Sequence, residues 1–159
     1  MMGERLHVVR TAESWVGTPY HHRGQIKHAG VDCAMLLYCV WFEAGLLESF
    51  PIDDYPPDWH LHRSVERYAL KLLEYCTELT TEEEPKPADI LLFKFGRAYA
   101  HGVIITGYPM GIHAQIKVGT VRTNVLTDPF FTNTTEKIDG NQGKPRKRKV
   151  FRFNRWIND

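Results

Sequence analysis

The stretch GVDCAMLLYCVWFEAG, residues 30–45, sets the fold class of this chain. Its apolar residues recur at the spacing of one helix face, at Cys33, Leu36, Leu37, Val40, Trp41 and Ala44. Asp32 is suited to cap the first turn, because its carboxylate can accept hydrogen bonds from free backbone N–H groups, and Gly45 is suited to end the last turn. The pattern predicts an amphipathic helix with Cys33 in its first turn, on the face directed towards the core.

The flanking segments predict one further helix on each side. Residues 11–15 are expected to form a short helix that ends at the GTP run of residues 17–19, and a polar, His-rich loop follows over residues 20–30. Residues 50–58 hold three prolines and three aspartates and are expected to form an irregular loop. Residues 61–79 show helical periodicity and predict a second long helix.

The second half of the chain has the pattern of strands. The expected elements are an acidic connector at 80–87, strands at 90–95, 101–106 and 112–118, a turn at 107–111 and a closing edge strand at 149–156. Helices followed by a run of strands predict an α+β fold with an antiparallel sheet. With 159 residues, the chain is expected to form a single domain over residues 1–159.

The composition is that of a globular protein and excludes several functional classes. Hydrophobic residues make up 43% and charged residues 25% of the sequence, which excludes a disordered or fibrous chain. The formal net charge of +1 provides no overall attraction to nucleic acid or anionic lipid. No apolar run of about 18 residues occurs, and residues 1–10 lack the apolar core of a signal peptide. We therefore expect no membrane span, and a protein that stays in the cytoplasm or leaves it without such a signal.

Three cysteines occur, Cys33, Cys39 and Cys76, and no two of them form a CxxC pair. This odd number argues against a disulfide scaffold or a structural zinc site. A thiol reacts as the thiolate, and a helix N-terminus favours this anion through its free N–H groups and its dipole. Cys33 is expected at such a position, Cys39 in mid-helix and Cys76 near a helix end, so Cys33 is the candidate nucleophile. The alternative is that all three are buried, inert thiols.

A thiol nucleophile needs a base that titrates near neutral pH and a third group that orients this base. His101 opens the apolar run HGVIIT, and His113 follows the next turn. In an antiparallel hairpin with a loop of odd length, both side chains project from the same face, which predicts a line of Cys33, His101 and His113. The alternative is that each histidine is a hydrogen-bonded structural residue.

The register of this hairpin distinguishes the two interpretations. A tight hairpin would place His113 opposite Ile105, about 13 Å along the strand from His101, which is too far for a hydrogen bond. The catalytic hypothesis therefore predicts that His113 lies opposite Val103 with a longer loop, or that a β-bulge draws the two rings together. It also predicts that the Cys33 sulfur lies within about 4 Å of the other His101 nitrogen.

Two other groups of side chains are weaker candidates. His21, His22 and His28 share one polar loop, but their spacing matches no familiar zinc pattern, so we expect no metal. The basic run at 144–149 is compatible with nucleic-acid binding. A solvated sheet edge is the simpler interpretation, and we expect no nucleic-acid partner.

Five short motifs follow one another along most of the chain, over about residues 11–118. They are GTPY at 17–20, GVDC at 30–33, PADILLF at 87–93, AHGVIITG at 100–107 and IHA at 112–114. In this order and spacing they resemble the NlpC/P60 family of cell-wall cysteine peptidases. The resemblance implies a papain-like α+β fold in which the helix that begins near Cys33 packs on a central antiparallel sheet.

The resemblance also implies a reaction, which is hydrolysis of a peptide-stem amide in peptidoglycan, commonly the bond between D-γ-glutamate and a diamino acid. Cys33 is then the nucleophile, His101 the base and later the acid for the leaving amine, and His113 the orienting residue. The backbone N–H of Cys33 and the Tyr20 hydroxyl are expected to stabilise the oxyanion, and Asp32 is expected beside the substrate. No metal ion or organic cofactor is implied.

The chain departs from the family pattern at two motifs. The usual DCSG is DCAM here, with Ala34 and Met35 after the nucleophile, and the usual YxxGG is YHHRG at 20–24. Because both motifs adjoin the expected cleft, the changes bear on substrate specificity. Met35, which is larger than the usual glycine, is expected to reshape the cleft.

The run YPPDW at 55–59 resembles the phage-associated branch of the family, whose members are tail-assembly or tail-tip peptidases. With it we expect peptidoglycan stem peptides as substrate, phage tail proteins as partners, and action at the bacterial cell wall from the virion tail. Two alternatives stay open. One is a structural tail component with the same fold and little activity, and the other is an amidase or acyltransferase of the same fold.

Overall fold

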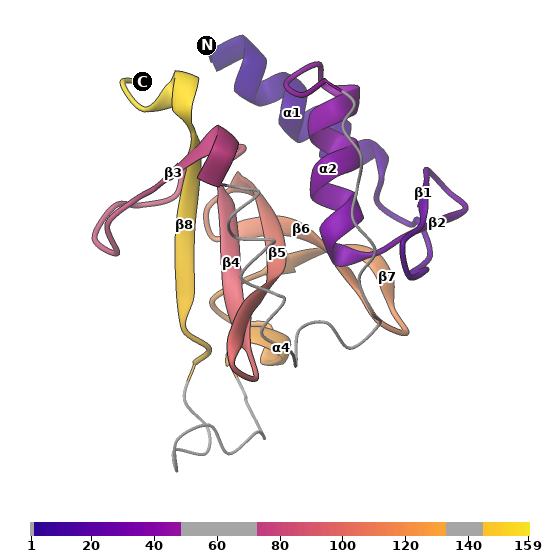
Figure 1. The fold of residues 1–159 in the computed structure, drawn as a ribbon. Coiled ribbons are helices and arrows are strands. Elements are labelled where there is room, and N and C mark those ends of the chain that lie inside the picture. The colour runs from indigo at the N-terminus through magenta and orange to yellow at the C-terminus, as the bar shows by residue number, and fades with distance from the viewer. Residues whose placement is uncertain (1, 49–72, 133–144) are drawn as a thin grey trace.

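The computed structural model describes residues 2–48, 73–132 and 145–159, which form two layers (Figure 1). One layer consists of helices α1 (Met2–Ser14) and α2 (Cys33–Glu43), which pack against each other and against the sheet. The other layer is a six-stranded antiparallel sheet. This is the α+β architecture expected from the sequence. No helix in these ranges is long and apolar enough to cross a membrane.

The strand order of the sheet is β3-β8-β4-β5-β6-β7, with antiparallel neighbours throughout. Its strands are β3 (Cys76–Glu78), β4 (Ile90–Phe95), β5 (Ala98–Gly107), β6 (Met110–Gln115), β7 (Gly119–Asn124) and β8 (Arg148–Phe153). The smaller elements are the hairpin of β1 (Gln25–Ile26) and β2 (Gly30–Val31), the helix α4 (Pro129–Thr132) and the 3-10 helix η3 (Asn154–Trp156). Figure 1 shows α1 and α2 at one end of the fold and α4 near the turn between β4 and β5.

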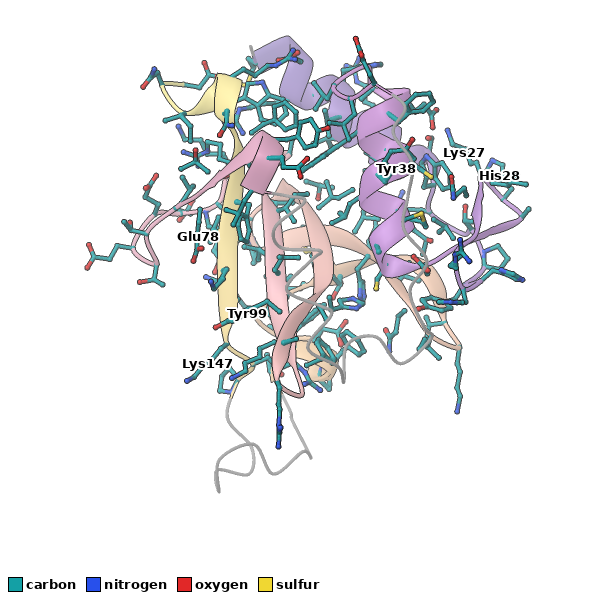
Figure 2. All side chains as sticks on the ribbon, in the orientation of Figure 1. Lys27, His28, Tyr38, Glu78, Tyr99 and Lys147 are labelled. Carbon is teal, nitrogen blue, oxygen red and sulfur yellow. The ribbon has the colours of Figure 1, made fainter. Side chains whose placement is uncertain are left out.

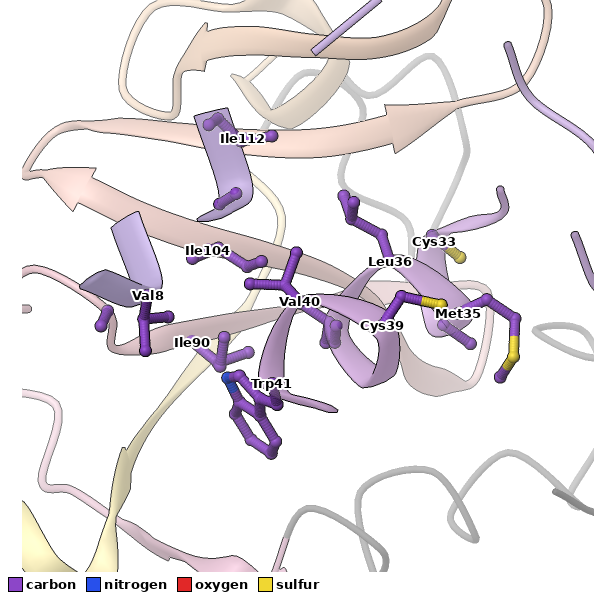
Figure 3. Packing of buried hydrophobic residues seen from close by; sticks show 14 of the residues in the cluster. Val8, Cys33, Met35, Leu36, Cys39, Val40, Trp41, Ile90, Ile104 and Ile112 are labelled. Atoms are coloured by element: carbon purple, nitrogen blue, oxygen red, sulfur yellow. The ribbon is translucent and has the colours of Figure 1, made fainter. Parts of the chain in front are cut away.

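Helix α2 forms where predicted, and its sequence explains both ends. The Asp32 carboxylate accepts hydrogen bonds from two backbone N–H groups of the first turn, at 2.8 and 3.1 Å, which have no partner within the helix. Gly45 follows the last turn with a φ of 76°, a conformation that glycine adopts without strain. The predicted apolar face is buried, and Figure 3 shows Leu36 and Val40 directed towards the sheet.

Side chains alternate between the two faces of the sheet and form two apolar clusters. Ile104 and Ile112 belong to the cluster under α2. Val103 and Ile105 belong to the cluster on the opposite face, which Phe131 of α4 covers. The sheet therefore has a helix on each face at the places where the site residues lie.

A buried ion cluster joins both ends of the chain to the start of β4. The fully buried Asp89 accepts hydrogen bonds from Arg5 at 3.0 Å and from Arg152 at 2.7 Å. Both arginines are at most 4% exposed, so the three charges have little contact with solvent. Since a buried charge without a partner is costly, this cluster fixes α1 and β8 relative to β4.

The sequence predicted the types of these elements better than their bounds. The helix expected at 11–15 is the last part of the longer α1, and the strand expected at 101–106 is the middle of the longer β5. The strand expected at 112–118 corresponds to β6, which ends at Gln115. The loop expected at 20–30 contains the small β1–β2 hairpin.

Two predictions about the sheet edge are wrong in part. The helix expected at 61–79 lies largely outside the described residues; within them residues 73–75 are helical, but Cys76 begins the strand β3, so the helix does not extend to residue 79. Because β3 pairs with β8, the strand predicted to close the sheet lies between β3 and β4. Pairing with β8 therefore determines the conformation of residues 76–78, although the sequence of this segment has helical periodicity. The loop expected at 50–58 and the run YPPDW at 55–59 lie outside the described residues.

The hairpin of β5 and β6 has the register that the catalytic hypothesis requires. Ile104 pairs with Ile112, so the next residues along the two strands, Val103 and His113, lie opposite each other. A bulge with Thr106 as the extra residue produces this shift. The connection between the strands is tight. Of the two arrangements considered from the sequence, the structure therefore has the β-bulge and not the longer loop.

Candidate active site

Cys33 is the first residue of α2, and its side chain is 7% exposed. It lines a cavity of about 160 Å³. The residues that line this cavity are Tyr20, Cys33, Phe95, Ala100, His101, Ala114, Gln115, Ile116 and Phe130. The sulfur of Cys33 lies 4.0 Å from the carbonyl oxygen of Ala100, the residue before His101. Thiol and imidazole therefore share one cavity, while the expected distance between them, about 4 Å, stays a prediction.

A second bulge interrupts β5 beside these residues. Phe93 pairs with His101 and Lys94 pairs with Tyr99, so Ala100 is the extra residue. Ala100 belongs to the core cluster under α2, whereas His101 contacts the phenylalanines of the opposite face, as expected for successive residues of a strand. Both residues line the cavity, which therefore lies where groups from the two faces come together.

The surroundings of the Cys33 thiol oppose its ionisation. Burial raises the pKa of Cys33, the Asp32 carboxylate raises it further, and the backbone N–H groups of Ala34 and Cys33 offset this rise only in part. The helix start favours the thiolate, as expected from the sequence, but burial and Asp32 outweigh its effect on the pKa of Cys33. Its proton needs an acceptor in the cavity, and the imidazole of His101 is in that cavity.

His101 and His113 are hydrogen-bonded through their rings. Nε2 of His101 lies 2.7 Å from Nδ1 of His113, with the ring planes at 79°. The exposed fraction is 8% for His101 and 0% for His113. The two residues are diagonal neighbours across β5 and β6, a spacing that long side chains bridge. The predicted ring contact is confirmed.

His113 is held neutral by its burial. Loss of hydration lowers the pKa of His113 to about 4, although the Asp128 carboxylate acts to raise it. A neutral imidazole has one N–H group and one acceptor nitrogen, so Nδ1 of His113 can accept a hydrogen bond from Nε2 of His101. This arrangement leaves the His113 proton on Nε2. Within the described part of the chain this buried Nε2 has no hydrogen-bond partner.

Phenylalanine rings surround the histidine pair. The ring centroid of Phe130 lies 4.9 Å from that of His101 and 5.2 Å from that of His113. Phe131 contacts the same two rings at 6.0 and 5.1 Å, and Phe95 lies 5.3 Å from His101. Apolar surroundings of this kind strengthen a hydrogen bond whose groups are paired.

Tyr20 and Asp32 have different surroundings. Tyr20 lines the cavity, and burial together with the charges of Cys33 and Asp32 raises the pKa of its hydroxyl, which therefore stays a donor. Asp32 is 1% exposed, and in addition to capping α2 it accepts a hydrogen bond from the backbone N–H of Arg23 at 2.7 Å. It does not line the cavity. The cap is confirmed, and a contact of Asp32 with substrate stays a prediction.

The other candidates do not form a second site. His28 lies in the turn of the β1–β2 hairpin at the periphery of the fold (Figure 2), and Nδ1 of His22 lies 3.8 Å from Asp32. In the described ranges no group of three or more His, Cys, Asp or Glu side chains can hold a metal ion. The described part of the basic run at 144–149 leads into β8, where Lys147 extends away from the sheet (Figure 2).

The apolar wall of the cavity has no signature in the sequence. Phe95 ends β4, Ile116 follows β6 and Phe130 belongs to the four-residue helix α4, so only the sheet order brings them together. Hydrophobic periodicity cannot identify a helix this short. Met35 contributes less than expected, because it is 4% exposed and does not line the cavity.

A thiol at a helix start shares a cavity with an imidazole that is hydrogen-bonded to a second imidazole behind it, an arrangement that cysteine hydrolases use. Carried by a helix packed on an antiparallel sheet, it defines a papain-like α+β class. The chain belongs to the NlpC/P60 family, a family of cysteine peptidases, whose model matches residues 17–139.

Two solved structures share this fold. The NlpC/p60 domain of the peptidoglycan hydrolase SagA superposes with a TM-score of 0.55 and 19% identity, over 92% of this chain and 97% of that chain. NlpC2 from Trichomonas vaginalis superposes with a TM-score of 0.60 and 12% identity, over 92% of this chain and 46% of that chain. This chain therefore matches about half of the second structure. No curated protein matches the sequence.

Proposed function

We propose that this chain is a cysteine peptidase that hydrolyses peptide-stem amide bonds of bacterial peptidoglycan, with Cys33 as nucleophile and His101 as base. The observation that carries this proposal is the shared cavity, in which the Cys33 thiol and the His101 ring meet. A hydrogen bond of 2.7 Å to His113 fixes the orientation of that ring. Membership of the NlpC/P60 family supports both the reaction class and the cell-wall substrate.

The reaction begins with transfer of the Cys33 proton to Nδ1 of His101, the ring nitrogen that does not face His113. The thiolate attacks the substrate carbonyl, while Nε2–H of His101 donates to the neutral His113. The backbone N–H of Cys33 belongs to a first helical turn, whose N–H groups have no partner within the helix. Together with the Tyr20 hydroxyl it stabilises the negative charge on the carbonyl oxygen.

The same two side chains complete the cycle. The C–N bond breaks, and the leaving amine takes the proton from Nδ1 of His101, which leaves a thioester on Cys33. His101 then accepts a proton from water as the water attacks the thioester. The carboxylic acid leaves, and the thiol is restored.

For the scissile bond we propose the one between D-γ-glutamate and a diamino acid, as the resemblance implies. The SagA domain, which shares the fold, is named as part of a peptidoglycan hydrolase. The cavity wall of Phe95, Ile116 and Phe130 suits the aliphatic part of a diamino acid side chain.

We place the protein at the bacterial cell wall as part of a phage or prophage tail, with tail proteins as partners. The support is the run YPPDW at 55–59. A structural tail component with little activity is the alternative. Against it, Cys33, His101 and His113 are all present, and the histidine pair has hydrogen-bonding geometry.

Incubation with defined muropeptides, followed by mass spectrometry of the products, tests this function. We expect one product that ends in D-γ-glutamate and one that begins with the diamino acid. Cys33→Ala should yield neither product, and Cys39→Ala, a matched change in the same helix, should yield both. A folded wild-type protein without cleavage would favour the structural alternative, and cleavage of another amide or of an acyl ester would favour the amidase or acyltransferase.

A further inference from the structure

The short helix α4 places two aromatic rings over the histidine pair. Phe130 and Phe131 are adjacent in sequence, and each ring contacts both imidazoles, at centroid distances between 4.9 and 6.0 Å. Phe130 also lines the cavity, whereas His113 is fully buried and does not. The ring of Phe130 is therefore both a wall of the cavity and a cover of the His101–His113 hydrogen bond.

Contacts from two other segments hold α4 in this position. Asp128 accepts a hydrogen bond from the backbone N–H of Phe130 at 2.9 Å and another from the Thr123 hydroxyl of β7 at 2.6 Å. Nε of Arg146 donates to the Phe130 carbonyl at 3.1 Å, and its guanidinium lies 3.6 Å from the ring centroid of Phe95. A helix of four residues has little stability of its own, so these contacts determine where Phe130 lies.

We propose that Phe130 is a positioning residue for the reaction, which excludes water from the His101–His113 hydrogen bond and so keeps His113 an acceptor. The inference rests on the proposed function, because it takes His101 as the base. A hydrated imidazole titrates near pH 6.5, and once protonated it has no acceptor nitrogen for its partner. In the covered site burial lowers the pKa of His113 to about 4, so Nδ1 stays an acceptor in the neutral range.

In the described ranges, two titratable groups act on His113, and one further charge lies near its aromatic cover. His101 on β5 is its hydrogen-bond partner, Asp128 lies before α4, and the Arg146 guanidinium lies over the Phe95 ring. Asp128 raises the pKa of His113, and burial outweighs that effect. Truncation of Phe130 removes none of these charges, so it changes chiefly the hydration of the pair.

Phe130→Ala in the full chain tests the proposal through the ring nitrogens of His113, titrated by NMR between about pH 4 and 8. We expect the pKa of His113 to rise by about one unit or more towards the value of a hydrated histidine. The acid limb of the Cys33 alkylation rate with iodoacetamide should move to higher pH with it, because a protonated His113 no longer accepts from His101. Alkylation needs no substrate, so this readout is independent of the bond cleaved.

Matched variants distinguish a positioning role of Phe130 from a general role in packing. Phe130→Leu should restore the wild-type titration, because leucine keeps an apolar cover. Ile116→Ala, a truncation in the same cavity wall, should leave it unchanged, because Ile116 is 52% exposed and covers little of the buried histidine pair. If Phe130→Ala does not fold, Phe130→Val should show the same shift in smaller size.

A folded Phe130→Ala or Phe130→Val protein with unshifted His113 titration and an unshifted acid limb would overturn the proposal, whatever happens to KM. So would an Ile116→Ala variant with an equal shift. If the shifts occur but no muropeptide is cleaved by the wild type, the proposed function fails and the positioning role stands.

Discussion

At the residue scale, the proposed chemistry depends on which nitrogen of His113 holds the proton. Nδ1 faces His101 at 2.7 Å and must accept, which leaves a buried Nε2–H group without a partner among the described residues. An unsatisfied buried donor costs about 1–3 kcal/mol. The other nitrogen of the same ring orients His101, and this role explains why the unsatisfied Nε2–H group is retained.

Replacement of His113 should therefore be tolerated when an acceptor remains. His113→Gln or His113→Asn should keep appreciable activity, because a side-chain amide oxygen can accept from the His101 ring. His101→Ala should abolish turnover, since proton transfer contributes about 10²–10⁴-fold and no other described histidine lines the cavity. The measurement is kcat/KM on a soluble muropeptide, and total loss in His113→Gln as well would contradict separate roles for the two histidines.

At the scale of elements, two bulges interrupt β5 at the two ends of the segment that carries His101. One bulge has Ala100 and the other Thr106 as its extra residue, and the second sets the register that joins the two histidines. Gly111 makes this register possible. A Cβ atom there would lie 2.5 Å from Cγ1 of Val103 and 2.9 Å from the carbonyl oxygen of Ile104.

Gly111→Ala should therefore displace β6 relative to β5 and lengthen the His101–His113 contact. We expect kcat to fall more than KM rises, because base orientation acts in the transition state. Gly107→Ala is the matched control in the same hairpin, since a Cβ at Gly107 meets nothing within 4 Å. The two variants should differ in kcat and in the histidine NMR signals, and equal behaviour would contradict the role of this register.

Local signals explain which elements the sequence predicts. The α2 helix has an apolar stripe, a cap at Asp32 and a stop at Gly45, so periodicity and end signals agree. Strand parity predicts the pair of His101 and His113, provided that the register of β5 and β6 brings the two rings together. In contrast, β7 carries polar residues at Thr120 and Thr123 that are buried only by its neighbours, and α4 is too short for periodicity. Tertiary contacts alone place these elements and the cover of the site.

At the scale of the whole molecule, the cluster of Arg5, Asp89 and Arg152 connects both ends of the chain to the sheet. Asp89→Asn would leave the two buried arginines only their longer contacts, Arg5 with Asp159 at 3.6 Å and Arg152 with Glu83 at 3.5 Å, and breaking such a buried pair costs about 3–5 kcal/mol. For a chain of this length we expect the melting temperature to fall by about 6–20 °C. Circular dichroism melts at neutral pH would measure the change.

Glu83→Gln provides the control for that variant. Glu83 lies 3.5 Å from Arg152 but is 47% exposed, so its loss should change the melting temperature little. Equal melting temperatures of Asp89→Asn and the wild type would show that the cluster does not fix the ends of the chain.

The most direct test of the central claim compares the alkylation of the three cysteines at about pH 6, where ordinary thiols are protonated. Burial and Asp32 raise the pKa of Cys33, and an imidazolium beside the sulfur acts in the opposite direction. Opposite charges about 4 Å apart attract by about 4 kcal/mol at an effective dielectric constant of about 20, which offsets about three units of a raised thiol pKa. After brief exposure to iodoacetamide, peptide mapping should find Cys33 labelled before Cys39 and Cys76, and His101→Ala should remove this preference. Labelling of Cys39 or Cys76 first, or an unchanged Cys33 rate in His101→Ala, would contradict the pairing of Cys33 with His101.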